Sequence, residues 1–229
     1  MEVEEKMVLF VALDAERRPL QRRAASLPVH RFGLGYVNGL KAARSREKSQ
    51  VFGNVGLSGG IAGPLVAGDV VVARKIICRN QQGEQVCYQT DDGLAQALAE
   101  KIKLPGLRIH EGPVACVPGP VLTSRAKAEL GRQTGALAVD MESAAVARAA
   151  EELRKPFFCL RVICDPLHRS VHEALLAGVD DRGNSRPGRL ALALLQRPSL
   201  LIPFLAMLRD YNQAANTLTR LGPCLAAFP

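Results

Sequence analysis

The chain of 229 residues contains no tryptophan, and aromatic residues make up only 4% of it. Proteins that bind single-stranded nucleic acid stack bases on aromatic side chains, so this scarcity argues against such a function. No run of 18 apolar residues occurs, which predicts that no segment spans a membrane. The N-terminal sequence MEVEEK is acidic and the apolar run Met7–Leu13 is short, so we expect no signal peptide.

No pair of cysteines has the C-x-x-C spacing that is typical of metal and redox sites. We interpret the six cysteines as buried free thiols of a cytoplasmic protein, because most lie in apolar runs. Cys164 stands beside Asp165, and there a nucleophilic role is the alternative to simple packing. His168 and His172 could share a metal on a helix, but no third ligand stands nearby, so we predict no metal site.

Positive charge is in excess, with a formal net charge of +8 and a pI near 9.5. A concentrated basic patch would attract phosphate, nucleic acid or an anionic membrane. The arginines are scattered instead, and no nucleic-acid-binding motif accompanies them. We therefore expect a solvated, arginine-rich surface and no nucleic-acid partner.

Strand-like apolar runs alternate with helical segments, which is typical of an α/β fold. We predict one domain over residues 1–229, with a core at about 7–178 and an apolar helical extension at about 186–222. The predicted strands are Met7–Leu13, Val29–Leu34, Val51–Leu57, Asp69–Ile77, Leu107–Val117, Ala136–Val139 and Phe157–Ile163. The predicted helices before the extension are Tyr36–Ser45, Asp91–Lys103, Ser124–Gln133 and Glu142–Lys155.

Carboxylates stand at the ends of two of these strands. The segment Ala138–Val146 reads AVDMESAAV, and Leu160–Pro166 reads LRVICDP. Ligands of open α/β sheets bind beyond the carboxyl ends of the strands. We therefore expect Asp140, Glu142 and Asp165 to project into one crevice.

The motifs VDMES and RVICDP resemble those of the purine nucleoside phosphorylase and methylthioadenosine/S-adenosylhomocysteine nucleosidase superfamily. The resemblance covers about residues 7–178. It implies a three-layer fold with a mixed sheet between helices, and a reaction that cleaves an N-glycosidic bond. It further implies substrate contacts from Asp140, Met141, Glu142 and Arg161, with Glu142 on the ribose diol, and Asp165 as the acid that protonates a purine N7.

Three further segments resemble the same superfamily. Glu16, just past the first strand, matches the residue that activates water in the nucleosidases; an exposed loop acid is the alternative. Gly35 ends a G-L-G turn beside the ribose or phosphate site. Ser58 and Gly59 belong to the glycine-rich loop NVGLSGG, whose backbone N–H groups can hold an anion or a hydroxyl.

The chain also departs from the superfamily pattern. Phosphorylases carry an arginine at the position of Asn54 and a hydroxyl residue at that of Leu57, and both contact phosphate. Their absence argues against phosphorolysis, although inorganic phosphate stays the alternative co-substrate to water; no other cofactor is expected. The segment that matches the superfamily's base site reads PGPVL here, and the resemblance implies base contacts from Val121 and Leu122.

The C-terminal sequence RPGRLALALLQRPSLLIPFLAMLRDYNQAANTL resembles the hopanoid-associated phosphorylase subgroup. That resemblance implies adenosylhopane as substrate, with methylthioadenosine or S-adenosylhomocysteine as the runner-up. The helix from Ser199 to Leu221 carries an apolar stripe at helical spacing: Leu201, Leu205, Leu208, Asn212, Ala215 and Leu218. The stripe fits a helix packed on the sheet, a wall for an apolar substrate, or peripheral contact with the inner face of a membrane.

These observations predict a cytoplasmic enzyme that takes a small adenosyl substrate and, by family analogy, forms a homodimer. The alternative outside enzymology is a nucleoside-binding or membrane-associating protein that keeps the fold.

Overall fold

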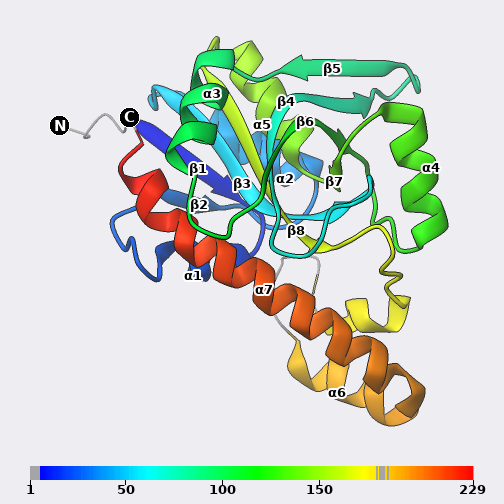
Figure 1. Cartoon of the computed structure of the whole chain (residues 1–229). Coiled ribbons are helices and arrows are strands. Elements are labelled where there is room, and N and C mark those ends of the chain that lie inside the picture. Colours follow the sequence, from blue (N-terminus) through cyan, green and yellow to red (C-terminus); the bar gives the residue numbers. More distant parts are fainter. Residues whose placement is uncertain (1–5, 179, 181–183, 185, 229) are drawn as a thin grey trace.

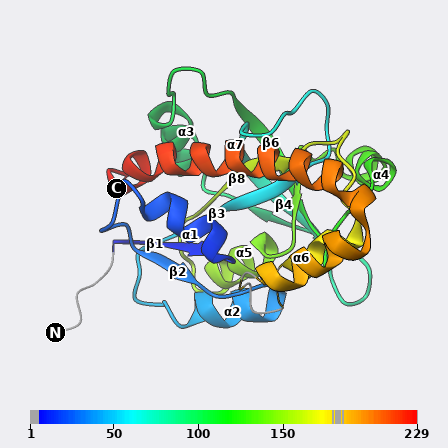
Figure 2. The same ribbon diagram turned by 90° about the horizontal axis from the view of Figure 1, so that it is seen from below.

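In a computed structural model of the chain, residues 6–178, 180, 184 and 186–228 are described, and they form a mixed sheet between two layers of helices (Figure 1). Helices α1, α3 and α7 pack on one face of the sheet and α2 and α5 on the other. Figure 2, seen from below, shows α7 lying across its face of the sheet. The predicted α/β fold with a mixed sheet is confirmed.

Eight strands build the sheet within the described part of the chain. They are β1 (Met7–Val11), β2 (Val29–Arg31), β3 (Val51–Gly60), β4 (Val70–Arg79), β5 (Gln85–Gln89), β6 (Ile109–Cys116), β7 (Ala138–Asp140) and β8 (Phe157–Asp165). The short strand β5, which reads QVCYQ, was not predicted; it pairs antiparallel with β4 at the edge of the sheet.

Five strands close into a ring. β8 pairs in parallel with β3 and antiparallel with β4, while β3, β7, β6 and β4 pair in that order. The register of β3 against β8 shifts between Ser58 and Gly59, where β3 reaches the end of its partner. Such a bulge bends a strand and re-aims its side chains. The carboxyl ends of β1, β3 and β8 share one edge, because these strands run parallel.

The helices are α1 (Asp14–Gln21), α2 (Tyr36–Arg44), α3 (Asp92–Lys101), α4 (Ser124–Thr134), α5 (Ser143–Glu152), α6 (Pro187–Gln196) and α7 (Leu201–Ala226), with 3-10 turns η1 (Glu173–Gly178) and η2 (Pro198–Leu200). Asp91, the first residue of the predicted helix Asp91–Lys103, caps α3 and accepts from Leu94 N. The cap of α4 is Thr123, one residue before the predicted helix Ser124–Gln133. Glu16 lies in helix α1, and not in the exposed loop that was the alternative.

The side chains of β8 point alternately to the two faces of the sheet and contribute to two hydrophobic cores. Phe158, Leu160 and Val162 face the α1, α3 and α7 layer, whereas Phe157, Cys159 and Ile163 face the α2 and α5 layer. Successive strand side chains point to opposite faces, so one buried strand serves both cores. An apolar run of this kind, interrupted here by Arg161, is typical of a strand covered on both sides.

Helix α7 has two environments. Its C-terminal part is buried against the sheet and α1 through Leu218, Leu221 and Leu225. Its N-terminal part extends beyond the body together with α6 (Figure 1), and there Leu201, Leu205 and Leu208 are exposed. The prediction that this helix packs on the sheet along its whole apolar stripe is therefore wrong for the first half of the helix.

We expect Gly222→Ala to destabilise the protein by about 1–3 kcal/mol, the usual cost of overpacking. A Cβ at Gly222 would lie 2.2 Å from the backbone oxygen of Leu20, so α1 and α7 would have to separate. Urea unfolding followed by far-ultraviolet circular dichroism measures the change. The matched control is Gly188→Ala in α6, where a Cβ meets no atom within 4 Å. Equal stability of the two variants would contradict the prediction.

Candidate active site

A cavity of about 360 Å³ opens where β1, β3, β7 and β8 end. Nine of the predicted site residues line it: Glu16, Ser58, Gly59, Val121, Leu122, Asp140, Met141, Glu142 and Asp165. The other two, Gly35 and Arg161, do not line the cavity, and each holds one of its carboxylates from behind. The sheet edge thus brings together residues that lie up to 149 positions apart in the chain.

Glu16 is buried at the first turn of α1. Its Oε2 accepts hydrogen bonds from the backbone N–H groups of Ala12 and Leu13, at 2.8 and 2.9 Å, and its Oε1 accepts from Leu57 N at 2.8 Å. Burial raises the pKa of Glu16 above its usual value, although these three hydrogen bonds and the charge of Arg161 oppose that shift. The result is a fixed carboxylate with a raised proton affinity.

Glu142 stands between β7 and α5. Gly35 N, at the start of α2, donates to its Oε1 at 3.0 Å. Gly35 has a φ of +95°, a backbone conformation that glycine adopts without strain. Burial, followed by the charge of Asp140, raises the pKa of Glu142 to about 7. This carboxyl therefore changes its charge near neutral pH.

Asp140 and Arg161 form a buried ion pair behind the cavity. The Arg161 Nε donates to Asp140 Oδ2 at 2.5 Å, and Asp140 Oδ1 accepts from the N–H and hydroxyl of Ser143. The Arg161 Nη2 donates to Asn54 Oδ1, and the Asn54 amide donates to Phe10 O at 2.9 Å. The Asn54 side chain thus positions Arg161, and Asn54 does not line the cavity.

Asp165 is held by a lysine that the sequence reasoning missed. Lys127 of α4 has no exposed surface, and its Nζ lies 2.7 Å from Asp165 Oδ2. The same ammonium donates to the carbonyl oxygens of Asp165, Pro166 and Arg169, at 2.8, 3.2 and 2.9 Å. One side chain therefore fixes both the carboxylate and the loop that carries it.

The Cys164 thiol faces the same carboxylate, with its Sγ 3.4 Å from Asp165 Oδ1. Burial and the neighbouring Asp165 charge raise the pKa of this thiol well above its usual range. A thiol that stays protonated is a weak nucleophile, which supports the packing role over the nucleophilic one.

The lining of the cavity contains both polar and apolar side chains. The Ser58 hydroxyl is buried and has no hydrogen-bond partner among the described residues, although it lines the cavity. Four apolar side chains of the lining, which we call the apolar wall, are Leu122, Val171, Leu176 of η1 and Met207 of α7. Among the described residues that line the cavity, none is lysine or arginine. An unpaired buried hydroxyl is costly, which makes Ser58 a candidate ligand-binding group.

A model of the phosphorylase superfamily matches residues 30–196. This chain belongs to the phosphorylase superfamily. The superfamily predicted from VDMES and RVICDP is thereby confirmed, and the chain is an enzyme of the nucleosidase and nucleoside phosphorylase class.

Known proteins agree with this assignment. A 5′-methylthioadenosine/S-adenosylhomocysteine nucleosidase of Maridesulfovibrio salexigens is 24% identical over 183 residues, which are 72% of this chain and 78% of that protein. The Helicobacter pylori nucleosidase of the same name, in complex with an inhibitor, has a similar structure: its TM-score is 0.72 and its identity 17%, over 96% of this chain and 97% of that one. A futalosine hydrolase mutant of Helicobacter pylori has a TM-score of 0.67 at 16% identity, over 95% and 98%.

We expect Lys127→Met to destabilise the protein by about 1–3 kcal/mol, because buried oxygens lose their donor. The exposed Lys41→Met on α2 is the matched control and should change the stability by less than about 0.5 kcal/mol. Urea unfolding of the two variants beside the parent protein measures both values. If Lys127→Met unfolds like Lys41→Met, the buried lysine does not hold the Asp165 loop.

Proposed function

We propose that this enzyme hydrolyses the N-glycosidic bond of an adenosyl substrate and releases adenine. The observation that carries the proposal is the cavity itself, whose lining combines Glu16, Glu142 and Asp165 with an apolar wall. The substrate is a small molecule, as for the nucleosidase relatives with inhibitors bound. We also propose a homodimer, which the family resemblance implies.

The ribose is held by Glu142 in this proposal. Its carboxylate accepts hydrogen bonds from the two neighbouring hydroxyls of the sugar, and ionised acceptors form the stronger bonds. Gly35 N fixes one oxygen of that carboxylate, so the acceptor is oriented before the nucleoside arrives. Met141, the preceding residue, packs against the sugar from the same wall of the cavity.

Asp165 serves as the general acid. As the bond between C1′ and N9 breaks, its electron pair moves onto the purine, and a proton passes from the Asp165 carboxyl to N7. The ribose then carries positive charge, and Glu16 and Glu142 stabilise it. The carboxylate left on Asp165 is stabilised by the Lys127 ammonium at 2.7 Å.

Water is the nucleophile in our proposal, and Glu16 is its base. The raised proton affinity of this buried carboxylate suits proton abstraction near neutral pH. The oxygen of water bonds to C1′ and its proton passes to Glu16. A phosphate ion would need a cation in the cavity, and none of the described lining residues supplies one. The Ser58 hydroxyl can hold the water, because it has no other partner in the described part of the chain.

The apolar wall selects the 5′ substituent. Met207 belongs to the C-terminal segment, so the part of the sequence that resembles the hopanoid-associated subgroup borders the cavity, which Leu176 of η1 also lines. A large apolar group on the 5′ carbon would be covered there, which supports adenosylhopane as the preferred substrate. The runner-up is methylthioadenosine or S-adenosylhomocysteine, in keeping with the Maridesulfovibrio relative.

Adenine release from adenosylhopane and from methylthioadenosine, each with and without phosphate, tests the reaction. We expect faster release from adenosylhopane at equal concentration, and no effect of phosphate on either substrate. Asp165→Asn should lower kcat by about 10²–10⁴, the usual contribution of a general acid, and should keep the fold. A rate that requires phosphate would contradict hydrolysis. Unchanged turnover in Asp165→Asn would remove the proposed acid.

A riboside whose leaving group needs no proton, such as 4-nitrophenyl riboside, is the control for Asp165→Asn. Its cleavage should be nearly unaffected in the variant, because nitrophenolate leaves without protonation. Loss of both reactions would show that the substitution damages the site as a whole.

The affinity for a nucleoside should rise with pH, because Glu142 ionises at a pKa of about 7. Between pH 6 and pH 8 its ionised fraction rises about tenfold, and the ionised form binds the diol better. Calorimetry with 7-deazaadenosine, which lacks N7 and is not protonated there, measures the dissociation constant. In Glu142→Gln the affinity should be low and independent of pH; an unchanged pH dependence would assign the titration to another group.

A further inference from the structure

Helix α6 and the first turns of α7 form a lobe that projects from the body of the molecule (Figure 1). We define this lobe as residues 186–209. Six of its large apolar side chains are exposed: Leu192, Leu195, Leu201, Ile202, Leu205 and Leu208. The most exposed are Leu195 at 78% and Ile202 at 80%, on either side of the turn between the two helices. Contiguous apolar surface of this kind marks an interaction site.

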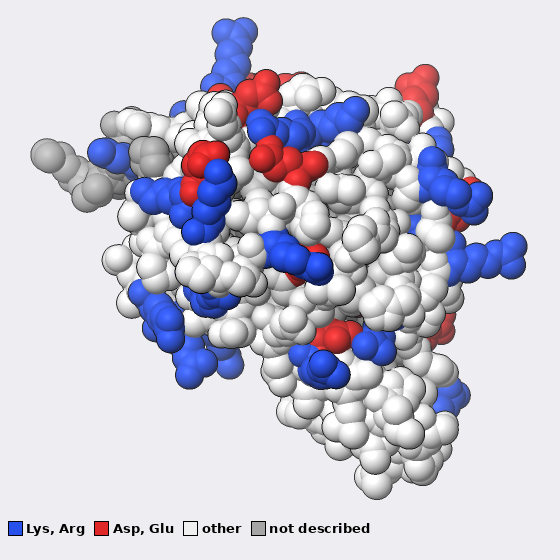
Figure 3. All heavy atoms as spheres, viewed as in Figure 1, with Lys and Arg blue, Asp and Glu red and all other residues white. Residues whose placement is uncertain are grey.

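The lobe carries positive charge only. Residues 186–209 contain four arginines and no aspartate or glutamate. Within the described part of the chain, Arg186 pairs with Asp180 at 2.8 Å, while no ion pair forms at Arg189, Arg197 or Arg209. Figure 3 shows the outer end of the lobe as an almost uncharged surface, with basic side chains and an acidic group between them nearer the body. An apolar end with basic flanks matches the interface of an anionic bilayer, where acyl chains lie beneath negatively charged headgroups.

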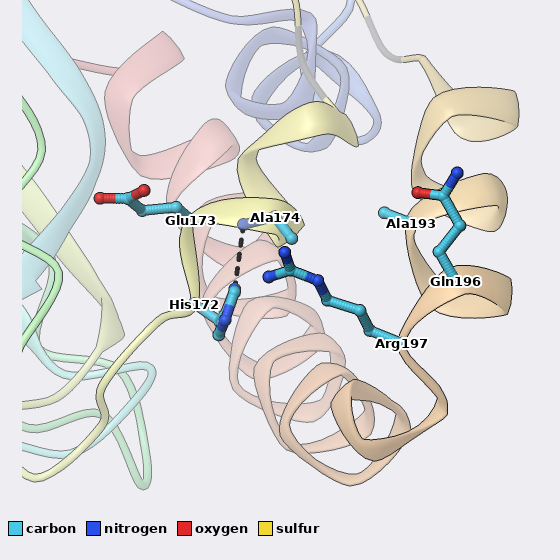
Figure 4. Close-up of a pocket in the computed structure, with 6 residues that line it drawn as sticks. All are labelled: His172, Glu173, Ala174, Ala193, Gln196 and Arg197. Carbon is cyan, nitrogen blue, oxygen red and sulfur yellow. Dashed lines mark hydrogen bonds between the residues drawn. The ribbon is translucent and has the colours of Figure 1, made fainter.

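A polar cleft of about 380 Å³ lies beside the lobe, between η1 and the end of α6. Arg197 reaches across it toward His172 (Figure 4). Ala174 N donates to His172 Nδ1 at 3.1 Å, so a proton on this imidazole is carried by Nε2. The Glu173 carboxylate points away from Arg197 (Figure 4). The cleft therefore offers a guanidinium and an imidazole N–H, which are donors that suit a phosphate group.

The bend between the helices limits how the lobe can meet a membrane. No single helix in the described residues is long and apolar enough to cross a bilayer; the pair Pro187–Gln196 and Pro198–Ala226 is so only when the two are taken together, and it is bent by 116°. The bend favours contact with a membrane surface. A second copy of the chain fits this surface less well, because it would bring four more arginines against the same four.

We propose that the α6–α7 lobe docks peripherally on an anionic lipid bilayer, with its apolar end among the acyl chains and the Arg197–His172 cleft around a lipid phosphate. Met207 belongs to the lobe and also lines the cavity, so docking brings the cavity to the membrane surface. The inference rests on the surface of the lobe and does not depend on the proposed reaction.

Co-sedimentation of the full chain with vesicles tests the proposal. One set of vesicles is phosphatidylcholine alone, and the other contains about a quarter phosphatidylglycerol. We expect clear binding to the anionic vesicles, weaker binding to the neutral ones, and a decrease with salt. The double variant Leu195→Glu/Ile202→Glu should bind at least about tenfold more weakly. Arg197→Ala should lose about fivefold, and on anionic vesicles only.

The matched control is Val37→Glu on α2, a site 77% exposed and outside the lobe, which should bind like the parent protein. Circular dichroism verifies that every variant is folded. Absence of binding to both vesicle types would overturn the proposal, and so would equal binding by the double variant. A change from dimer to monomer in the double variant, without vesicle binding by the parent, would assign the lobe to self-association and also overturn it.

Discussion

The buried guanidinium of Arg161 is the charge on which the site depends. It pairs directly with Asp140, and it lowers the proton affinity of both Glu16 and Glu142. Burial disfavours the charged guanidinium, yet the charge of Asp140 and the other acidic groups around it together raise its pKa above the usual value. Carboxylates gathered in a low-dielectric pocket would otherwise repel one another and take up protons. Gly56 leaves the room for this arrangement, since a Cβ there would lie 2.4 Å from Glu16 Oε1 and 2.8 Å from Arg161 Nη1.

Sequence patterns located the carboxylates better than the groups that hold them. Asp140, Glu142 and Asp165 follow apolar strands, and strand order alone brings such positions to one edge of a sheet. Lys127 gives no comparable signal, because the segment SRAKAEL reads as an ordinary surface helix. Only the tertiary fold places the Asp165 loop over its ammonium. Distances between segments that far apart in the chain are not encoded in local periodicity.

The local sequence is also a poor guide to the structure of two segments, the run that forms α1 and the stripe of α7. The run DAERRPLQ is charged and contains Pro19, which is unfavourable inside a helix, and yet it forms α1. Tertiary contacts override that propensity, since Leu20 is fully buried and Glu16 accepts hydrogen bonds from the backbone N–H groups of Leu13 and of Leu57 in β3. The predicted apolar stripe of α7 forms a helix, but the C-terminal part of this helix is buried on the sheet and its N-terminal part is exposed. A stripe predicts which residues share a face and not what covers that face.

The closed ring of strands has a consequence for how the enzyme is made. Strand β3 finishes at Gly60, but it pairs with β8, which begins about a hundred residues later. During synthesis the early strands leave the ribosome long before Arg161 does. Until then, Glu16 has no buried positive charge beside it, and the space that Gly56 leaves for the Arg161 side chain is not filled. Contacts of such long sequence separation form late, because chain closure must precede them. We therefore expect the cavity to be among the last parts of the nascent chain to take shape, with its acidic residues hydrated until then.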